Sequence, residues 1–363
     1  MLERKHLQTL EGYVSGFQPT WSNDLIKLNS NENPYPPSPK IKDYFKDFNF
    51  DQLRFYPNAK SDSLRECIAN IYDIDVENIF CGNGSDEIIS LLFKGFFEEN
   101  SSVIIPYPTY TLYETVAKIH NVNTICIDTE EDFSIDVDKI LSSSKKAAGI
   151  VIVNPNAPTG ILLSVEKIKF ILNQFKGLVI LDEAYIDFAD KNSSCLQLIK
   201  TYPNLIVLRT LSKSYSLCGI RLGYCFASKD IISVLDKIKD SYNLNTITQL
   251  LAEEGLKDRA YFNHNLEKVK STRTRLGHEL VNLGFDIYGQ NANFLLCKPN
   301  NGLEAKAIYD YLAEQNIFIR YFDQPRLADK LRISIGTEKE IDILLINLHK
   351  LVREKGMSFE SSV

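Results

Sequence analysis

Seven short apolar runs, separated by stretches with helical periodicity, constrain the fold of this 363-residue chain more than any other feature. Continuous apolar runs of this length are typical of strands that are buried on both faces, as in parallel sheets covered by helices. The alternation therefore predicts an α/β fold, with a three-layer large domain around a mainly parallel seven-stranded sheet. The expected strands are Ile79–Cys81, Val103–Ile105, Thr124–Ile127, Ile150–Val153, Leu178–Leu181, Leu205–Leu208 and Gly223–Phe226.

Side chains able to carry chemistry follow the carboxyl ends of several of these runs. Ligands in open α/β sheets bind outside that edge, so the sequence predicts a ligand site there. The candidates are the turn at Gly84 with Ser85 and Asp86, Tyr110, the 154–160 turn, Asp182 and Lys213.

Lys213 lies in a polar turn just after the run Leu205–Leu208, between Ser212 and Ser214, and eight residues before Arg221. A lysine held in this way can form a Schiff base with a carbonyl compound. Ser212 and Arg221 are donor types that would hold a phosphate beside it. A solvated loop lysine is the simpler interpretation of this stretch taken alone.

The run Leu178–Leu181 ends in Asp182, with Tyr185 three residues later. A carboxylate at the end of an inner strand is unfavourable unless it meets a cation or caps the next segment. A protonated pyridine nitrogen is such a cation, and a lysine Schiff base with an Asp partner is what a protein supplies to pyridoxal phosphate. Together with Lys213 and Arg221, in this order, Asp182 favours that cofactor.

The free amides of Ser85 and Asp86 follow a glycine turn at the start of an expected helix. Gly82 and Gly84 allow close backbone approach, and helix amino termini bind phosphate. An ordinary helix cap at Ser85 is the alternative for this turn taken by itself.

The length exceeds one ordinary core, which predicts more than one domain. We expect an amino-terminal arm over 1–35, a large domain over 36–260 and a small α+β domain over 261–363. The arm holds several prolines and little periodicity, whereas the long charged stretch Tyr261–Gly284 indicates a connecting helix. The small domain is expected to contain a helix over Ala305–Glu314 and strands over Phe285–Tyr288, Asn293–Cys297, Ile317–Tyr321 and Leu331–Ile335.

The net charge of −6 provides no general attraction to nucleic acid or to an anionic membrane, so an anionic substrate needs a local basic cluster. Seven scattered cysteines without a CxxC motif indicate buried thiols in a reducing compartment. The five histidines show no metal-ligand spacing, and no apolar run is long enough to span a bilayer. A cytoplasmic protein without a metal is therefore expected.

Several motifs spread over nearly the whole chain resemble those of the fold-type I pyridoxal-phosphate aminotransferases, and among them the histidinol-phosphate aminotransferases. The motifs are Leu28–Pro34, Arg54–Pro57, Gly82–Glu87, Pro108–Tyr110, Asn154–Gly160, Asp182–Tyr185, Ser212 and Lys213 with Arg221, and Leu331–Thr337.

The resemblance implies a homodimer with shared active sites, in which Tyr56 reaches the neighbouring subunit's cofactor phosphate. It also implies that Tyr110 stacks on the pyridine ring and that Tyr13 and Asn31, from the arm, lie near the substrate. Many relatives carry Asn immediately before Pro-Thr-Gly, where this chain has Ala157. Either Asn156 replaces that cofactor contact or Tyr185 is left as the main donor.

In the resembling family, the positions of Arg320 and Arg332 hold the phosphate of the substrate. Arginine is suited to bidentate recognition of phosphate or carboxylate, but a structural ion pair is an equal alternative for each one singly. The implied reaction is the transfer of the amino group of L-histidinol phosphate to 2-oxoglutarate, with Lys213 as the base and acid.

Two other classes of function stay open at this point. A different reaction on the same scaffold, such as decarboxylation of threonine phosphate or transamination of aromatic amino acids, would use the same cofactor residues. A non-catalytic cofactor-binding module, as in transcription regulators, would carry a winged-helix segment in front, for which we expect no room in this chain.

Overall fold

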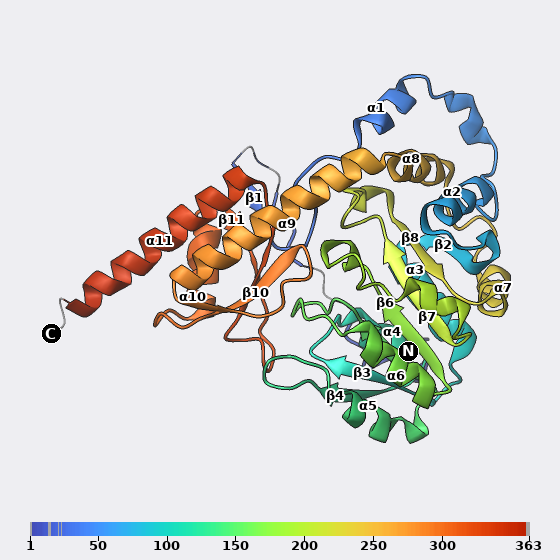
Figure 1. Cartoon of the computed structure of the whole chain (residues 1–363), viewed down its shortest axis with the longest axis horizontal. Helices are drawn as coiled ribbons and strands as arrows, with labels where there is room; N and C mark the ends of the chain where they lie inside the picture. Colours follow the sequence, from blue (N-terminus) through green and yellow to red (C-terminus); the bar gives the residue numbers. More distant parts are fainter. Residues whose placement is uncertain (1, 14–15, 21, 23, 361–363) are drawn as a thin grey trace.

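A mixed seven-stranded sheet forms the centre of the larger of two units in the computed structural model, which describes residues 2–13, 16–20, 22 and 24–360 (Figure 1). All neighbouring pairs are parallel except those of β8, which runs antiparallel to both β2 and β7. The predicted mainly parallel sheet is therefore confirmed. In spatial order the strands are β2 (Ile79–Asn83), β8 (Leu222–Phe226), β7 (Leu205–Thr210), β6 (Leu178–Asp182), β5 (Gly149–Val153), β3 (Ser102–Tyr107) and β4 (Asn123–Asp128).

Helices cover both faces of this sheet because successive strand residues point to opposite sides. Ile150 and Ile152 of β5 belong to one hydrophobic cluster, and Val151 and Val153 to another. The first cluster includes residues of α2 (Asp62–Tyr72), α5 (Val137–Ser143), α6 (Val165–Gln174) and α8 (Thr246–Lys257). The second includes residues of α3 (Gly84–Phe96), α4 (Leu112–Ile119) and α7 (Lys229–Ile238).

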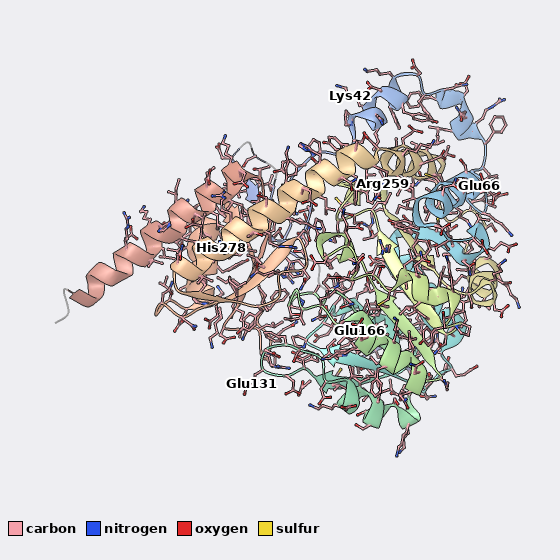
Figure 2. The ribbon with its side chains drawn as sticks, viewed as in Figure 1. Lys42, Glu66, Glu131, Glu166, Arg259 and His278 are labelled. Atoms are coloured by element: carbon pink, nitrogen blue, oxygen red, sulfur yellow. The ribbon has the colours of Figure 1, made fainter. Side chains whose placement is uncertain are left out.

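Outward-facing charges complete these amphipathic elements. Lys42 on α1 (Pro39–Lys46), Glu66 on α2, Glu131 in the loop after β4, and Glu166 on α6 are all exposed (Figure 2). Short 3-10 helices connect the longer elements; they are η1 (Lys5–Leu7), η2 (Phe50–Arg54), η3 (Val76–Asn78), η4 (Ser144–Lys146), η5 (Ile186–Phe188), η6 (Leu196–Lys200) and η7 (Cys218–Ile220). No helix in the described ranges is long and apolar enough to cross a membrane.

The smaller unit contains a four-stranded antiparallel sheet, reached through the long helix α9 (Arg259–Asn282). Figure 1 shows α9 running from the larger unit across the smaller one. The sheet order is β12 (Arg320–Tyr321), β13 (Leu331–Ser334), β10 (Phe294–Pro299) and β9 (Phe285–Ile287). Helices α10 (Ala305–Glu314) and α11 (Glu338–Glu360) complete this unit, so the expected helix over Ala305–Glu314 is confirmed.

One expected strand is wrong in its extent. The stretch Ile317–Tyr321 was expected to be a single strand, but it divides into β11 (Ile317–Phe318) and β12, which belong to different sheets. The short β11 pairs in parallel with β1 (Ile26–Lys27) from the amino-terminal segment. The amino-terminal segment is therefore hydrogen-bonded to the smaller unit, while the exact domain boundaries at 35 and 260 stay a prediction.

Candidate active site

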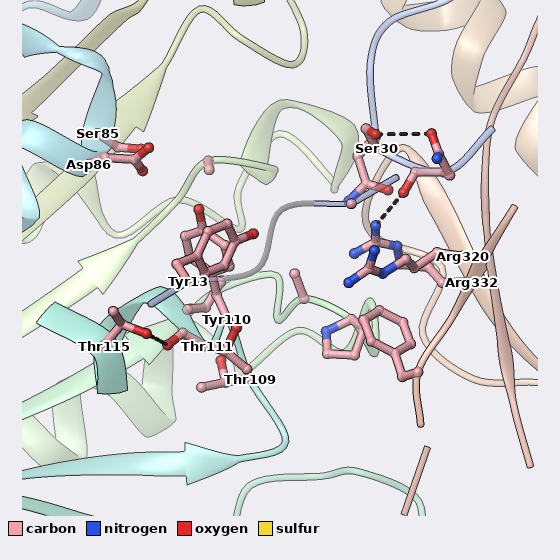
Figure 3. A pocket seen from close by; sticks show the side chains of 18 of the residues that line it. Tyr13, Ser30, Ser85, Asp86, Thr109, Tyr110, Thr111, Thr115, Arg320 and Arg332 are labelled. Carbon is pink, nitrogen blue, oxygen red and sulfur yellow. Dashed lines mark hydrogen bonds between the residues drawn. The ribbon is translucent and has the colours of Figure 1, made fainter. Parts of the chain in front are cut away.

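A cavity of about 880 Å³ lies at the carboxyl edge of the large sheet, between the two units and the amino-terminal segment. Figure 3 shows Ser85 and Asp86 on one side of it and Arg320 and Arg332 on the other. Twelve of the predicted site residues line this cavity: Tyr13, Asn31, Ser85, Asp86, Tyr110, Asp182, Tyr185, Ser212, Lys213, Arg221, Arg320 and Arg332. Residues from sequence positions 13 to 332 thus share one site.

One end of the cavity is built to receive an anion. Helix α3 begins at Gly84, and the backbone amides of its first turn have no partner within the helix. Arg221 lies against this turn, with Nη2 at 3.5 Å from Asp86 Oδ2 and Nη1 donating to Ser212 Oγ at 3.4 Å. Gly84 has φ of +80°, and a Cβ there would lie 2.5 Å from Arg221 Nη2. The left-handed backbone therefore favours glycine at this position, and the space that a Cβ would take is occupied by the guanidinium of Arg221.

The neighbouring strand fixes the position of this helix terminus. A Cβ on Gly223 of β8 would lie 2.3 Å from the backbone nitrogen of Ser85 and 2.4 Å from the carbonyl carbon of Gly84. Only a glycine lets the strand and the helix start approach so closely. The anion-binding turn is thus supported from below by backbone and not by a flexible side chain.

A buried carboxylate lies deeper in the cavity. Asp182 is 3% exposed, and its carboxylate accepts hydrogen bonds from Tyr113 Oη at 2.9 Å and from the backbone amide of Ala184 at 3.0 Å. Burial raises the pKa of Asp182 to about 6, although both donors act to lower it. No lysine or arginine of the described residues forms an ion pair with it, so this carboxylate is poised for a cation from a ligand.

Lys213 lines the same cavity and is held there by the amino-terminal segment. Its Nζ donates to the carbonyl of Ser30 at 3.4 Å and lies 5.6 Å from the centre of the Tyr185 ring. Asn33 Nδ2 donates to the carbonyls of Lys213 and Ser214, at 3.1 and 3.2 Å. The backbone that carries the amine is therefore fixed by a residue 180 positions earlier in the chain.

The loop around Lys213 also rests on a buried ionic network. Ser214 Oγ donates to Asp187 Oδ2 at 2.6 Å, and Arg209 bridges Asp187 and Glu183, with 2.8 Å to the latter. Arg209 and Glu183 are buried, and the ion pair between them is reinforced by a hydrogen bond from Arg209 Nη2 to Ser194 Oγ at 2.8 Å. Lys213 is thereby fixed from both sides of its turn.

Tyrosines complete the wall between the carboxylate and the arm. Asn31 Nδ2 donates to Tyr185 Oη at 3.0 Å, which orients that phenol. The ring of Tyr110 meets that of Tyr13 edge to face, with 5.9 Å between their centres. Asn31 has φ of +56° and is bound by Ser334 Oγ and Asn293 Nδ2 of the smaller unit, so both units fix its position.

Two arginines form the opposite wall. Arg332 is partly buried, donates from Nη2 to the carbonyl of Asn29 at 2.9 Å, and leaves its buried Nε without a hydrogen-bond partner among the described residues. Burial and the nearby charge of Arg320 lower the pKa of Arg332 to about 10, although Tyr185 acts to raise it. Arg320 forms no ion pair within the described part of the chain, and both guanidiniums border the cavity. They are available to an anionic ligand.

Two predicted residues lie outside the cavity. The side chain of Asn156 donates to the carbonyl of Pro108 and to Thr159 Oγ1, both at 2.9 Å, and accepts from Thr109 Oγ1 at 2.6 Å. Its amide is fully used in holding the turn, so the structure does not bring Asn156 to the ligand space, and Ala157 forms the wall there. Tyr56 is 81% exposed and stacks on Tyr242 at 4.4 Å, away from the site of its own chain.

This geometry fits pyridoxal phosphate, because one cavity is lined by an anion-binding helix start, a buried carboxylate without a cation and a fixed lysine. The fold and the site together define a fold-type I pyridoxal-phosphate enzyme.

Comparisons with known proteins agree with this class. The pattern of the family described as aminotransferase class I and II matches residues 23–348, and the chain belongs to that family. It is 41% identical over 349 residues to a histidinol-phosphate aminotransferase of Clostridium botulinum, covering 95% of this chain and 97% of that protein. Identity to a histidinol-phosphate aminotransferase 1 of Trichormus variabilis is 38%, over 96% and 99% of the two chains.

A solved structure shares the arrangement of both units. The crystal structure of the histidinol-phosphate aminotransferase from Clostridium acetobutylicum has a TM-score of 0.84 and 30% identity, over 91% of this chain and all of that one. The chain is thus an aminotransferase, and pyridoxal phosphate is its cofactor.

Proposed function

We propose that this enzyme transfers the amino group of L-histidinol phosphate to 2-oxoglutarate, which gives imidazole acetol phosphate and L-glutamate in histidine biosynthesis. The observation that carries the proposal is the pair Arg320 and Arg332, which border the cavity opposite the anion-binding helix start. The cofactor phosphate needs one anion site, and this pair supplies a second. The names of the full-length relatives support the same substrate.

Each residue that lines the cavity on the cofactor side would have one role in holding the cofactor. Ser85, Asp86, Ser212 and Arg221 would hold the cofactor phosphate through backbone amides, a hydroxyl and a guanidinium. Asp182 would bind the pyridine nitrogen, while Tyr185 would donate to the phenolic oxygen and Tyr110 would cover the ring. When bound, the cofactor supplies an electron-accepting ring that stabilises negative charge at the substrate carbon.

The protein's own contribution is to hold and move protons. Lys213 Nζ borders the cavity close to Tyr185 and is anchored by Ser30, so it would take a proton from the substrate carbon and pass it to the cofactor. Asp182, as a carboxylate, keeps the ring nitrogen protonated. Tyr13 and Asn31 would close the cavity on the side of the arm.

Arg320 and Arg332 would bind the substrate phosphate, and Arg332 would also meet the carboxylate of 2-oxoglutarate. Arginine suits both groups because its planar fork forms paired hydrogen bonds. The names of the full-length relatives favour the phosphorylated amine over an aromatic amino acid, because two arginines could also serve the two carboxylates of 2-oxoglutarate.

The decisive test compares kcat/KM for histidinol phosphate and for unphosphorylated histidinol in the wild type, Arg320→Ala and Arg332→Ala. A hydrogen bond to a charged group is worth about 1.5–3 kcal/mol, so each variant should lose roughly one to two decades with the phosphorylated amine. Arg320→Ala should change the rate with histidinol far less, and Arg332→Ala should also slow the 2-oxoglutarate half-reaction. A wild type that shows no preference for the phosphorylated amine would refute the proposal.

We further propose a homodimer in which Tyr56 reaches the cofactor phosphate of the partner subunit. Apolar side chains that are exposed near Tyr56 support an interface, because soluble chains rarely leave such groups together in water. They are Phe50, Leu53, Phe55 and Tyr242. Sedimentation at working concentration, with Tyr56→Phe as the comparison, tests this. A fully active monomer would exclude a shared site.

All seven cysteines are free thiols, which supports a reducing, cytoplasmic location.

A further inference from the structure

A small third hydrophobic cluster joins the two units beside the cavity. Its buried members are Phe133, from the loop after β4, and Leu296 and Leu327 of the smaller unit. Phe133 is only 2% exposed and has φ of +66°, a backbone conformation that bulky residues rarely adopt. Such a residue persists only where its surroundings hold it firmly. Ile161, Tyr288 and Phe322 pack against the cluster.

Arg326 fastens the same junction with polar contacts. From the smaller unit it donates to three neutral acceptors of the larger one: the carbonyl of Tyr107 at 3.2 Å, Thr129 Oγ1 at 3.0 Å and the carbonyl of Glu130 at 2.5 Å. Its guanidinium also lies 5.2 Å from the centre of the Phe133 ring. Like Phe133, Arg326 has a left-handed backbone, with φ of +67°. Arg326 therefore does not serve as an anion site, because both terminal nitrogens of its guanidinium already donate to these acceptors.

The loop that carries Arg326 is also a wall of the cavity. Phe322, Asp323, Gln324 and Leu327 all line it. The ring of Phe322 lies close to both cavity arginines, with its centre 5.1 Å from the guanidinium carbon of Arg320 and 5.4 Å from that of Arg332. Cation–π attraction to one shared ring offsets the repulsion between the two like charges. Arg332 is also held by the carbonyl of Asn29 and by the ring of Phe294, at 5.3 Å, so Phe322 is the ring that the two guanidiniums share.

We propose that Arg326 and Phe133 are positioning residues that act on the substrate through this wall. They fix residues 322–327 against the larger unit, and Phe322 then holds Arg320 and Arg332 at the separation that the substrate anion requires. The role in phosphate binding rests on the proposed function. The role of Arg326 and Phe133 in joining the two units does not depend on the proposed function, because all of those contacts lie within the protein.

The test uses the holoenzyme with Arg326→Gln, Thr129→Val and the matched control Arg275→Gln. Arg275 forms ion pairs with Glu338 and Asp342 on the far side of the smaller unit. Arg326→Gln should raise KM for the amino donor about tenfold while kcat changes less than about twofold. Thr129→Val removes one acceptor of Arg326 while keeping the shape of the side chain, and it should raise KM about threefold. This variant replaces Arg326→Gln in the test if the arginine variant does not fold. Arg275→Gln should leave KM unchanged.

Amide hydrogen exchange supplies the readout that is independent of activity. Residues 129–133 and 322–327 should exchange faster in Arg326→Gln and in Thr129→Val, and no faster in the control. Equal KM and equal exchange in wild type and Arg326→Gln would overturn the proposal, as would a rise in KM matched by an equal loss of cofactor affinity. If histidinol phosphate is not the donor, the same measurements on whichever amine is turned over still test the junction.

Discussion

Tyr113 donates a hydrogen bond from its phenol to Oδ2 of Asp182, at 2.9 Å, in the interior of the larger unit. Both side chains are buried, and Tyr113 is one helical turn beyond Tyr110, which lines the cavity. One helix start thus supplies a ring to the cavity and a donor to the buried carboxylate. The donor stabilises the ionised form of Asp182 against the effect of burial.

Tyr113→Phe should therefore raise the pKa of Asp182 above its value of about 6. The cofactor binds best to ionised Asp182, so its affinity should rise as pH rises through this pKa, and in the variant the rise should move to higher pH. Fluorescence titrations with cofactor at several pH values measure the shift. Tyr202→Phe, whose phenol bonds Asn173 at the surface, should keep the wild-type profile. Superimposable profiles for Tyr113→Phe would contradict the assignment.

The same pKa sets a stability prediction for the cofactor-free protein. Asp182 has a pKa above its ordinary value, so its favourable contribution is complete at acid pH, below about 4, and is lost as pH rises through about 6. Asp182→Asn should remove this loss and flatten the dependence between those values. Denaturant unfolding of both cofactor-free proteins at pH 5 and pH 7 measures how the free energy of unfolding changes with pH. About equal changes in the wild type and in Asp182→Asn would contradict the prediction.

Asn33→Ala removes the two hydrogen bonds that hold the backbone carbonyls of Lys213 and Ser214. Each such bond is typically worth about 1 kcal/mol, so kcat should fall roughly tenfold, with little change in the cofactor dissociation constant. Asn300→Ala, at an exposed site in the smaller unit, is the matched control. Wild-type turnover by Asn33→Ala would show that the arm does not position Lys213.

Gly223→Ala should abolish cofactor retention, because the added methyl group would overlap the backbone of Gly84 and Ser85. Gly219→Ala is the matched control, since a Cβ there meets nothing within 4 Å. Cofactor content after gel filtration separates the two variants. Full retention by Gly223→Ala would mean that the helix start can shift without losing its ligand.

Tyr242→Ala tests the support of Tyr56. The two rings stack at 4.4 Å with an angle of 9° between their planes, which fixes an otherwise exposed side chain. Aromatic pairs contribute about 0.5–1.5 kcal/mol beyond burial, so the cofactor dissociation constant should rise roughly three- to tenfold while the dimer persists. Phe170→Ala removes a comparably exposed ring on α6 and should have no effect. Unchanged affinity in Tyr242→Ala would leave the stack without a role in the shared site.

Sequence periodicity was sufficient for the large sheet because its inner strands are buried on both faces and read as continuous apolar runs. The edge strand β4 is only partly buried, and its short run Thr124–Ile127 was still recognisable. Motifs in the order of the chain were sufficient to predict that Lys213, Asp182 and Arg221 share one cavity, while their roles toward the cofactor stay predictions. Neither signal could give the partners of Asn33 or Tyr113, which depend on packing between distant segments. The i, i+3 spacing of Tyr110 and Tyr113 was the one available signal for the second.

Short strands were the other limit. The apolar run Ile317–Tyr321 looks like one strand, and only tertiary pairing divides it between two sheets. Asn156 shows a related limit. Its side-chain amide forms hydrogen bonds within the 154–160 turn and with the segment Pro108–Thr109, and the sequence alone does not show this.

The pairing of β1 with β11 separates the order of synthesis from the order of assembly. Ile26 leaves the ribosome almost three hundred residues before its partner Ile317. The larger unit can collapse during that interval, whereas the segment that anchors Lys213 and Arg332 must wait for the smaller unit. A nascent chain therefore gains its fold well before it gains its active site, and premature termination within the smaller unit leaves a cofactor cradle without catalytic competence.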